Sequence, residues 1–350
     1  MTAVSFNNVS IIFGDRPETA LAMVDQGKSR DEIGAATGLV LGVADASLTI
    51  EEGEILVLMG LSGSGKSTLL RAVNGLAPVV RGDVAVSTTT GPVNPYSCNA
   101  KALRDLRTHT VSMVFQQFAL LPWRTVTENV GFGLELAGMP EAERKLRVGE
   151  QLELVNLTKW AGRKVNELSG GMQQRVGLAR AFATGAPILL MDEPFSALDP
   201  LIRTRLQDEL LEFQRRLKKT ILFVSHDLDE AFRIGNRIAI MESGRIIQCG
   251  TPHDIVKNPA DQYVADFVQN LNPINMLTAA DVMQSGLGQT AAGMSVSATA
   301  RAATPLIDIL DALARQPGSI GIVENGAIVG TISAQDIVAG LTRHRRKQEA

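Results

Sequence analysis

The chain has 350 residues, 45% of them hydrophobic, with 34 Lys and Arg against 37 Asp and Glu and a formal net charge of −3. This length allows two or three domains with full cores, and the balanced charge argues against a general nucleic-acid-binding protein. The two cysteines, Cys98 and Cys249, lack metal-ligand spacing, so we expect no zinc site and no disulfide framework in a reducing compartment.

The amino-terminal residues and the lengths of the apolar runs bear on whether the chain is secreted or spans a membrane. The first residues lack the basic and apolar regions of a signal peptide, and no apolar run approaches the ~18 residues that span a bilayer. We therefore expect a soluble cytoplasmic protein that works at a membrane only through a partner.

Residues 3–13 alternate and then run apolar, which predicts a strand that ends at Phe13. No aromatic residue occurs between Phe13 and residue 60, so only Phe6 and Phe13 can offer a ring to an adenine base from this side. Phe6 suits the core, whereas Phe13 at the strand end is the candidate stacking residue, with a second core phenylalanine as the alternative. Residues 16–42 then predict an inserted segment of one or two short helices before strands resume at 43–50.

A glycine-rich loop follows the apolar run 55–59 and leads into an amphipathic helix. This strand, loop and helix predict a phosphate-binding loop whose backbone N–H groups surround a β-phosphate. Lys66 adds a positive charge for the β- and γ-phosphate oxygens, and the Ser67 hydroxyl suits Mg²⁺. The candidate binding residues of the loop are Gly60, Ser62, Gly63, Ser64, Gly65, Lys66, Ser67 and Thr68.

Three further short apolar runs, each typical of a buried strand, end in polar residues. Gln116 follows 111–115, and its amide suits Mg²⁺ or a bound water, with an exposed loop glutamine as the alternative. Asp192 and Glu193 follow 188–191, where the aspartate suits Mg²⁺ and the glutamate can polarise an attacking water. His226 follows 221–224 and is expected to reach a γ-phosphate, although a lone histidine is more often structural.

Residues 125–167 read as helical, with Leu146, Leu152 and Val155 on one apolar stripe. Ser169, Gly170 and Gly171 then open a helix that contains no lysine in its first turn. Such a helix start attracts anions, so we expect it to complete a phosphate site that is built elsewhere.

The carboxyl-terminal part begins with a boundary near residues 272–275. Residues 286–304 are rich in small residues and are expected to be loosely ordered, whereas 305–342 predict a compact unit of helix, two strands joined at 324–326, and helix. The basic cluster 343–347 reads as a solvated tail, with binding to anionic lipid as the alternative.

These motifs, in this order and including Ser196-Ala-Leu-Asp199, resemble the ATPase subunit of an ABC transporter over about residues 3–270. The resemblance implies an α/β RecA-like core with antiparallel β and helical subdomains, the latter at about 117–175, and it implies ATP and Mg²⁺ as ligands. It also implies a head-to-tail homodimer in which Ser169–Gly171 of one subunit meets the γ-phosphate at Lys66 of the other. By the same resemblance, Gln116 links Mg²⁺ to a membrane partner, Glu193 is the general base, His226 contacts the γ-phosphate and Asp199 acts across the dimer.

A finer resemblance connects the insertion 18–33 and the segment 115–122 to the importers of glycine betaine, proline betaine and choline. It implies a membrane permease, a periplasmic or lipid-anchored substrate-binding protein, and a place at the cytoplasmic face of the membrane. Those ATPases often carry paired CBS modules, and residues 305–345 resemble a single CBS motif in which Ser333 and Asp336 can hold a ribose. The expected division is therefore an ATPase domain at 1–272, a linker at 273–304 and the CBS-like motif.

Two other functions remain open at this point. An ABC importer for a different small solute is possible because no residue of the motor need touch the cargo. A soluble ABC ATPase that acts on nucleic acid is disfavoured, because such a chain would carry two ATPase halves, heptads or a basic face.

Overall fold

The computed structural model describes residues 1–116, 119–196, 198–269, 274, 277–285, 296–324 and 326–348, with side chains to residue 342. The chain forms two compact units, 1–249 and 250–350. The first unit therefore ends before the domain boundary expected at 272. Much of the expected linker, including residues 275–276 and 286–295, lies outside the described residues, as does Asn325 in the expected turn.

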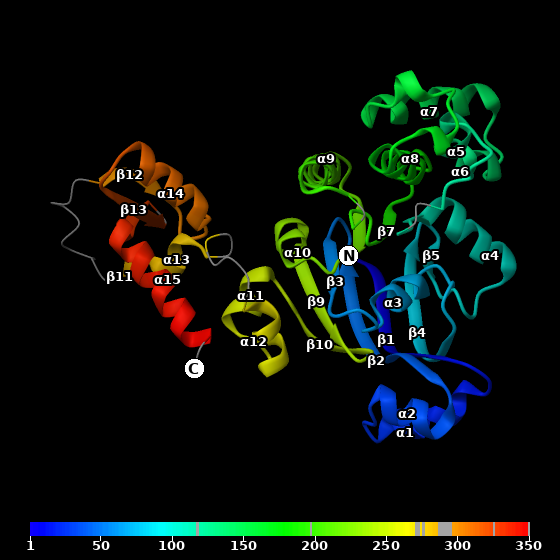
Figure 1. Ribbon diagram of the computed structural model, residues 1–350, viewed down its shortest axis with the longest axis horizontal. Helices are drawn as coiled ribbons and strands as arrows, with labels where there is room; N and C mark the ends of the chain where they lie inside the picture. Colours follow the sequence, from blue (N-terminus) through cyan, green and yellow to red (C-terminus); the bar gives the residue numbers. More distant parts are fainter. Residues whose placement is uncertain are drawn as a thin grey trace. The chain divides into compact units, whose positions relative to one another are not determined.

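Two β-sheets form the framework of the first unit (Figure 1). The strand order is β2-β1-β4-β5 in an antiparallel sheet and β10-β9-β3-β8-β7-β6 in the other, where β9, β3, β8, β7 and β6 run parallel. The strands are β1 (Thr2–Phe13), β2 (Val40–Glu51), β3 (Ile55–Met59), β4 (Val79–Thr88), β5 (Gly91–Val93), β6 (Val111–Val114), β7 (Ile188–Asp192), β8 (Thr220–Val224), β9 (Arg237–Glu242) and β10 (Arg245–Gly250). The strands expected from the apolar runs are therefore confirmed.

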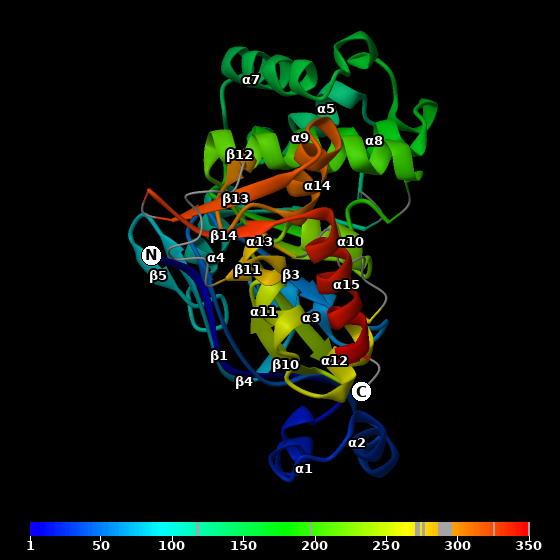
Figure 2. The ribbon, with the colours of Figure 1, turned by 90° about the vertical axis from the view of Figure 1, so that its left-hand side faces the viewer.

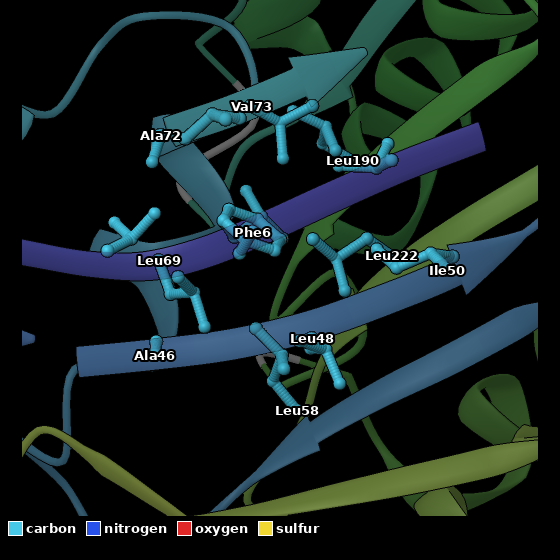
Figure 3. Close-up of a cluster of buried hydrophobic side chains, with 14 of the residues drawn as sticks. Phe6, Ala46, Leu48, Ile50, Leu58, Leu69, Ala72, Val73, Leu190 and Leu222 are labelled. Atoms are coloured by element: carbon cyan, nitrogen blue, oxygen red, sulfur yellow. The ribbon is translucent and has the colours of Figure 1, made fainter. Parts of the chain in front are cut away.

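One hydrophobic core joins the two sheets around the helix that follows the glycine-rich loop. Every residue of β3, β7 and β8 is buried, as expected for parallel strands whose two faces are both covered. Figure 3 shows Phe6 and Leu48 of the antiparallel sheet, Leu69 of α3 (Lys66–Ala72), and Leu58 and Leu222 of the parallel sheet in one cluster. The core therefore holds the start of α3 in a fixed position relative to both sheets.

The inserted segment after β1 forms two α-helices, as expected, with a smaller core of its own. It contains η1 (Pro17–Ala20), α1 (Leu21–Asp25) and α2 (Arg30–Thr37). Val24 and Ile33 pack with Ile12 and Leu41 of the first sheet. The insertion is thereby anchored to the sheet.

The helical region between β6 and β7 consists of several helices and not one long run. The elements are α5 (Val126–Val130), α6 (Phe132–Leu136), α7 (Glu141–Leu154), η3 (Thr158–Trp160), η4 (Val165–Glu167) and α8 (Gly170–Ala183). Figure 2 shows α7 lying over α8 with α5 beside them, and these helices share a separate core. Leu152 and Val155 are buried as expected, but Leu146 is 65% exposed, so its assignment to the apolar stripe is wrong. Leu152 lies six positions after Leu146, and this spacing places the two residues on different helix faces.

The remaining elements of the first unit are α4 (Ala100–Asp105), the π-helical turn η2 (Leu106–Thr110), α9 (Pro200–Leu217) and α10 (Leu228–Ile234). Among the residues that the structure describes, no helix combines the length and the apolar character needed to cross a bilayer.

The second unit contains a four-stranded sheet of order β11-β14-β13-β12 with its own core. Its elements are α11 (Pro252–Lys257), α12 (Gln262–Val268), α13 (Ala279–Val282), β11 (Gln284–Ser285), β12 (Val296–Ala300), α14 (Leu306–Arg315), β13 (Ser319–Glu324), β14 (Ala327–Ile332) and α15 (Ala334–Gln348). The expectation of a loosely ordered 286–304 is wrong at β12, which pairs in parallel with β13. Small residues there concealed a strand because they lack the bulky side chains that mark one in a sequence.

The core that surrounds α3 generates a stability prediction. Replacing Leu222, which is 1% exposed, with Ala leaves a cavity and is expected to lower the free energy of unfolding by about 2–5 kcal/mol in urea titrations. The matched control is Leu146→Ala on the exposed face of α7, for which a change within about 0.5 kcal/mol is expected. Equal losses for the two variants would contradict the assignment of the core.

Candidate functional site

The carboxyl ends of four adjacent parallel strands bring the predicted polar residues to one edge of the sheet. In the order β3-β8-β7-β6, these strands lead to the glycine-rich loop, His226, Asp192 with Glu193, and Gln116. Ligand sites in open α/β sheets lie at this edge, because loops that leave neighbouring parallel strands meet there. The structure therefore brings the glycine-rich loop, Gln116, Asp192, Glu193 and His226 to the same edge of the sheet.

The glycine-rich loop between β3 and α3 has no room for side chains at two of its glycines. A Cβ atom at Gly60 would lie 2.0 Å from the carbonyl oxygen of Met241, and one at Gly65 would lie 2.3 Å from that of Gly42. Their φ angles of 139° and 98° are also in the region that favours glycine. The loop therefore packs tightly on its outer side, while its inner side borders an open cleft.

Lys66 begins α3 and is almost completely buried. Its ammonium group donates hydrogen bonds of 2.9 Å to the carbonyl oxygens of Gly60 and Leu61. Burial lowers the pKa of the Lys66 amine, although the nearby carboxylates of Glu193 and Asp192 oppose this shift. A buried cation that is held only by carbonyl oxygens is suited to exchange those contacts for an anion.

Asp192 is fully buried at the end of β7 and has a partner for each carboxylate oxygen. The hydroxyl of Ser67 donates to Oδ1 over 2.6 Å, and Nη2 of Arg71 donates to Oδ2 over 2.9 Å. A buried carboxylate requires such partners because leaving a charge unpaired inside a protein is costly. The carboxylate and the hydroxyl together form a pair of oxygen ligands of the kind that Mg²⁺ prefers.

Glu193 lies beside the cleft, and two of the other predicted residues contact one of its carboxylate oxygens. Its Oε2 accepts a hydrogen bond of 3.0 Å from Nε2 of Gln116 and lies 3.2 Å from Nδ1 of His226. The backbone of Glu193 adopts a φ of 46°, and its N–H donates to the carbonyl of Val224 on the neighbouring strand. The carboxylate is thereby oriented by groups at the ends of β6 and β8, the two neighbours of β7.

These residues surround a cleft of about 390 Å³. Its lining residues are Phe13, Arg30, Gly42, Ser62, Gly63, Gly65, Lys66, Ser67, Thr68, Gln116, Glu193 and His226. Phe13 is 39% exposed whereas Phe6 is buried in the core, as expected from their places in the strand. The buried hydroxyl of Ser64 has no hydrogen-bond partner among the described residues, which leaves a polar atom of the loop unsatisfied. An aromatic ring can stack on a base, and the N–H groups of a glycine-rich loop together with a lysine can bind phosphates. These groups therefore fit a nucleotide with its phosphates.

The other predicted residues lie in a second cleft, of about 550 Å³, which shares no lining residue with the first. Ser169, Gly170, Gly171 and Asp199 line it together with residues that include Trp160. Ser169 caps α8 by accepting a hydrogen bond from the Met172 N–H, and Asp199 caps α9 in the same way. The structure therefore does not bring these residues to Lys66 within one chain.

Sequence reasoning missed two cations, one that contacts Asp192 and one that contacts the glycine-rich loop. Arg71 reaches Asp192 from the second turn of α3, and Arg30 reaches the loop from the inserted helix α2. Ser29 and Glu32 form a capping box that marks the start of α2, so the sequence could predict the helix. It contained no sign of which surface the helix would contact.

Comparisons with known proteins agree with this geometry. The family model described as ABC transporter matches residues 43–196. The glycine betaine/proline betaine transport system ATP-binding protein ProV of Escherichia coli (strain K12) is 44% identical over 345 residues, which cover 98% of this chain and 83% of ProV. The trimethylamine N-oxide transport system ATP-binding protein TmoW of Ruegeria pomeroyi is 42% identical over 337 residues, 95% of each chain.

A solved structure is also similar to this chain. It is described as the dimeric structure of a post-hydrolysis state of the ATP-binding cassette MJ0796 bound to ADP and Pi. It has a TM-score of 0.59 and 30% sequence identity, and it covers 71% of this chain and 98% of its own. Taken with the cleft at the strand ends, these likenesses show that the chain belongs to the ATP-hydrolysing, ATP-binding subunits of ABC transport systems, in the glycine betaine/proline betaine branch.

Proposed function

We propose that this protein is the motor of an importer for a quaternary amine, either glycine betaine or proline betaine, with choline as a further candidate. The meeting of Gln116, Glu193 and His226 beside Lys66 carries the motor assignment. The cargo assignment rests on the likeness to ProV along almost the whole chain, because the cargo need not touch the motor.

Hydrolysis is an in-line attack of water on the γ-phosphorus of ATP, in which the bond to the bridging β–γ oxygen breaks and ADP leaves. Glu193 is positioned to accept the proton of the attacking water, since its carboxylate borders the cleft. His226 is placed to hold a γ-phosphate oxygen, and Lys66 neutralises charge on the β- and γ-phosphates. Phe13 offers its exposed ring to the adenine base.

Ser67, Asp192 and Gln116 are the residues that would hold Mg²⁺. When bound there, the metal would screen the charge of the β- and γ-phosphates. Arg71 balances the charge of Asp192 as its ion-pair partner.

We also propose that two copies of the chain form each complete site. Ser169 and Gly170 are exposed at a helix start without a lysine, and they line a cleft that lacks the phosphate-binding loop. A helix start of this kind is suited to a γ-phosphate held by a second copy. Asp199 would then act at the interface between the copies, and the similar solved structure of MJ0796 is a dimer, which supports this arrangement.

The partners that follow from this role are a membrane permease and a substrate-binding protein, periplasmic or lipid-anchored, which place the motor at the cytoplasmic face of the membrane. In the second unit, the order β12-α14-β13-β14-α15 supports a single CBS-like motif. Ser333 and Asp336 bond to each other there at the start of α15, over 2.6 Å between the hydroxyl and the carboxylate. Ser333 and Asp336 therefore cap α15, independently of any ligand that they bind.

A trimethylamine N-oxide cargo is the second candidate. TmoW matches 95% of its own length, whereas ProV matches 83%. Glycine betaine and trimethylamine N-oxide both carry a trimethylated nitrogen, and the motor chemistry is the same for either cargo because the cargo need not touch the motor.

The role of Glu193 as base makes a direct prediction. Glu193→Gln keeps the shape and removes the proton acceptor, so steady-state phosphate release from MgATP is expected to fall about 100-fold or more while nucleotide binding persists. Glu150→Gln, on the exposed face of α7, is the matched control and should hydrolyse ATP at the normal rate. Phosphate release by Glu193→Gln within about twofold of the unaltered chain would contradict the role of base.

The cargo assignment is tested by uptake of labelled solutes into cells that depend on this transporter. Labelled glycine betaine is expected to accumulate with the unaltered chain and to lose nearly all transporter-dependent uptake with Glu193→Gln. Parallel assays with proline betaine, choline and trimethylamine N-oxide rank the candidates. Uptake of trimethylamine N-oxide alone would replace the proposed cargo, and uptake of none of the four would remove this cargo class.

A further inference from the structure

The inserted segment between β1 and β2 contributes a side chain to the nucleotide cleft. Arg30, the first residue of α2, lines the cleft together with Phe13 and Lys66, and its guanidinium donates to the carbonyl oxygen of Gly63 in the phosphate-binding loop. Through Arg30 the inserted segment contacts the phosphate-binding loop. None of the roles proposed above uses this residue. We infer that Arg30 is a nucleotide-binding residue that contacts a phosphate shared by ADP and ATP.

The charge of Arg30 supports this inference. Lys66 and Arg30 are the permanent cations among the residues that line the cleft, and Glu193 is the acid. Within the part of the chain that the structure describes, the hydrogen bond to the Gly63 carbonyl is the contact found for the Arg30 guanidinium, and no carboxylate pairs with it. A guanidinium carries five N–H donors in a planar fork that suits phosphate oxygens, so most of its donors remain for a ligand.

The position of Arg30 is fixed by structure on both sides of it. Glu32 closes a capping box on Ser29 and also pairs with Lys28, with an Nζ to Oε1 distance of 2.8 Å. These contacts hold the pKa of the Glu32 carboxyl at about 2, through the Lys28 hydrogen bond first and the Ser29 bonds next. Three residues further on, Ile33 is fully buried in the core of the insertion. The first turn of α2 is therefore held at both ends.

The insertion is also tied to both sheets of the first unit. Nη1 of Arg81 on β4 lies 2.6 Å from Oδ1 of Asp25, and Nη2 of Arg245 on β10 donates to the carbonyl of Val24 over 3.1 Å. A binding residue needs such support because a loosely held side chain loses much of its interaction energy in ordering. Arg30 thus has the placement of a ligand-binding residue.

The alternative is that Arg30 only braces the loop through Gly63. A purely structural contact would stabilise the folded loop, and its contribution would not depend on salt concentration, since the acceptor is a neutral carbonyl. A contact between a guanidinium and a phosphate depends on charge and weakens as salt screens it. Salt dependence therefore separates the two roles.

The test measures the dissociation constant of MgADP by titration calorimetry on the full chain, at low salt and in 0.5 M KCl. Arg30→Ala is expected to weaken binding about tenfold at low salt and much less at high salt, and Arg30→Lys is expected to recover part of the loss. Lys101→Ala is the matched control, because it removes an exposed cation of α4 that lines neither cleft, and its affinity should be unchanged.

Melting temperatures of the nucleotide-free variants complete the test, and they should stay near that of the unaltered chain. Unchanged MgADP affinity in Arg30→Ala, or a loss that is the same at both salt concentrations, would overturn the inference. The inference rests on the proposed nucleotide site, and the unaltered chain checks that site separately. Failure of the unaltered chain to bind MgADP would count against the proposed function and not against Arg30 alone.

Discussion

Parallel pairing of β3 with β8, of β8 with β7 and of β7 with β6 is the constraint on which the site depends. It brings segments that are far apart in the chain to one edge, so that a loop, an acidic pair, a histidine and a glutamine share one cleft. The pairing itself depends on burial, because all residues of β3, β7 and β8 are removed from water. Loss of the core would therefore separate the catalytic groups from one another, even though each side chain is chemically unchanged.

Three charged groups of the site have hydrogen-bond partners within the chain. Lys66 is held by two carbonyl oxygens, Asp192 by Ser67 and Arg71, and Glu193 by Gln116 and His226. Each of these contacts satisfies a group whose isolation in the protein would be costly. Binding of a nucleotide exchanges such internal contacts for contacts with phosphate, so the protein gains only the difference between the two.

Much of this arrangement could be predicted from the sequence because its signals are local. Short apolar runs that end in Gln116, Glu193 or His226 identify strand ends, and the loop before Lys66 has a fixed spacing. The arrival of Arg30 at that loop could not be predicted, since it depends on how the insertion folds back on the sheet. The exposed Leu146 shows a second limit of sequence-based prediction, because an apolar residue in a helix need not lie on the face that packs against the core.

The separation of the two clefts gives the account its central claim, namely that a second copy completes the site. The most direct test is the light-scattering mass of the full chain bearing Glu193→Gln, measured with and without MgATP. The account predicts a mass that doubles with MgATP, and a doubling that is lost when Ser169→Arg is added. A mass that remains that of one chain at saturating MgATP, or that doubles equally with Ser169→Arg, would contradict it.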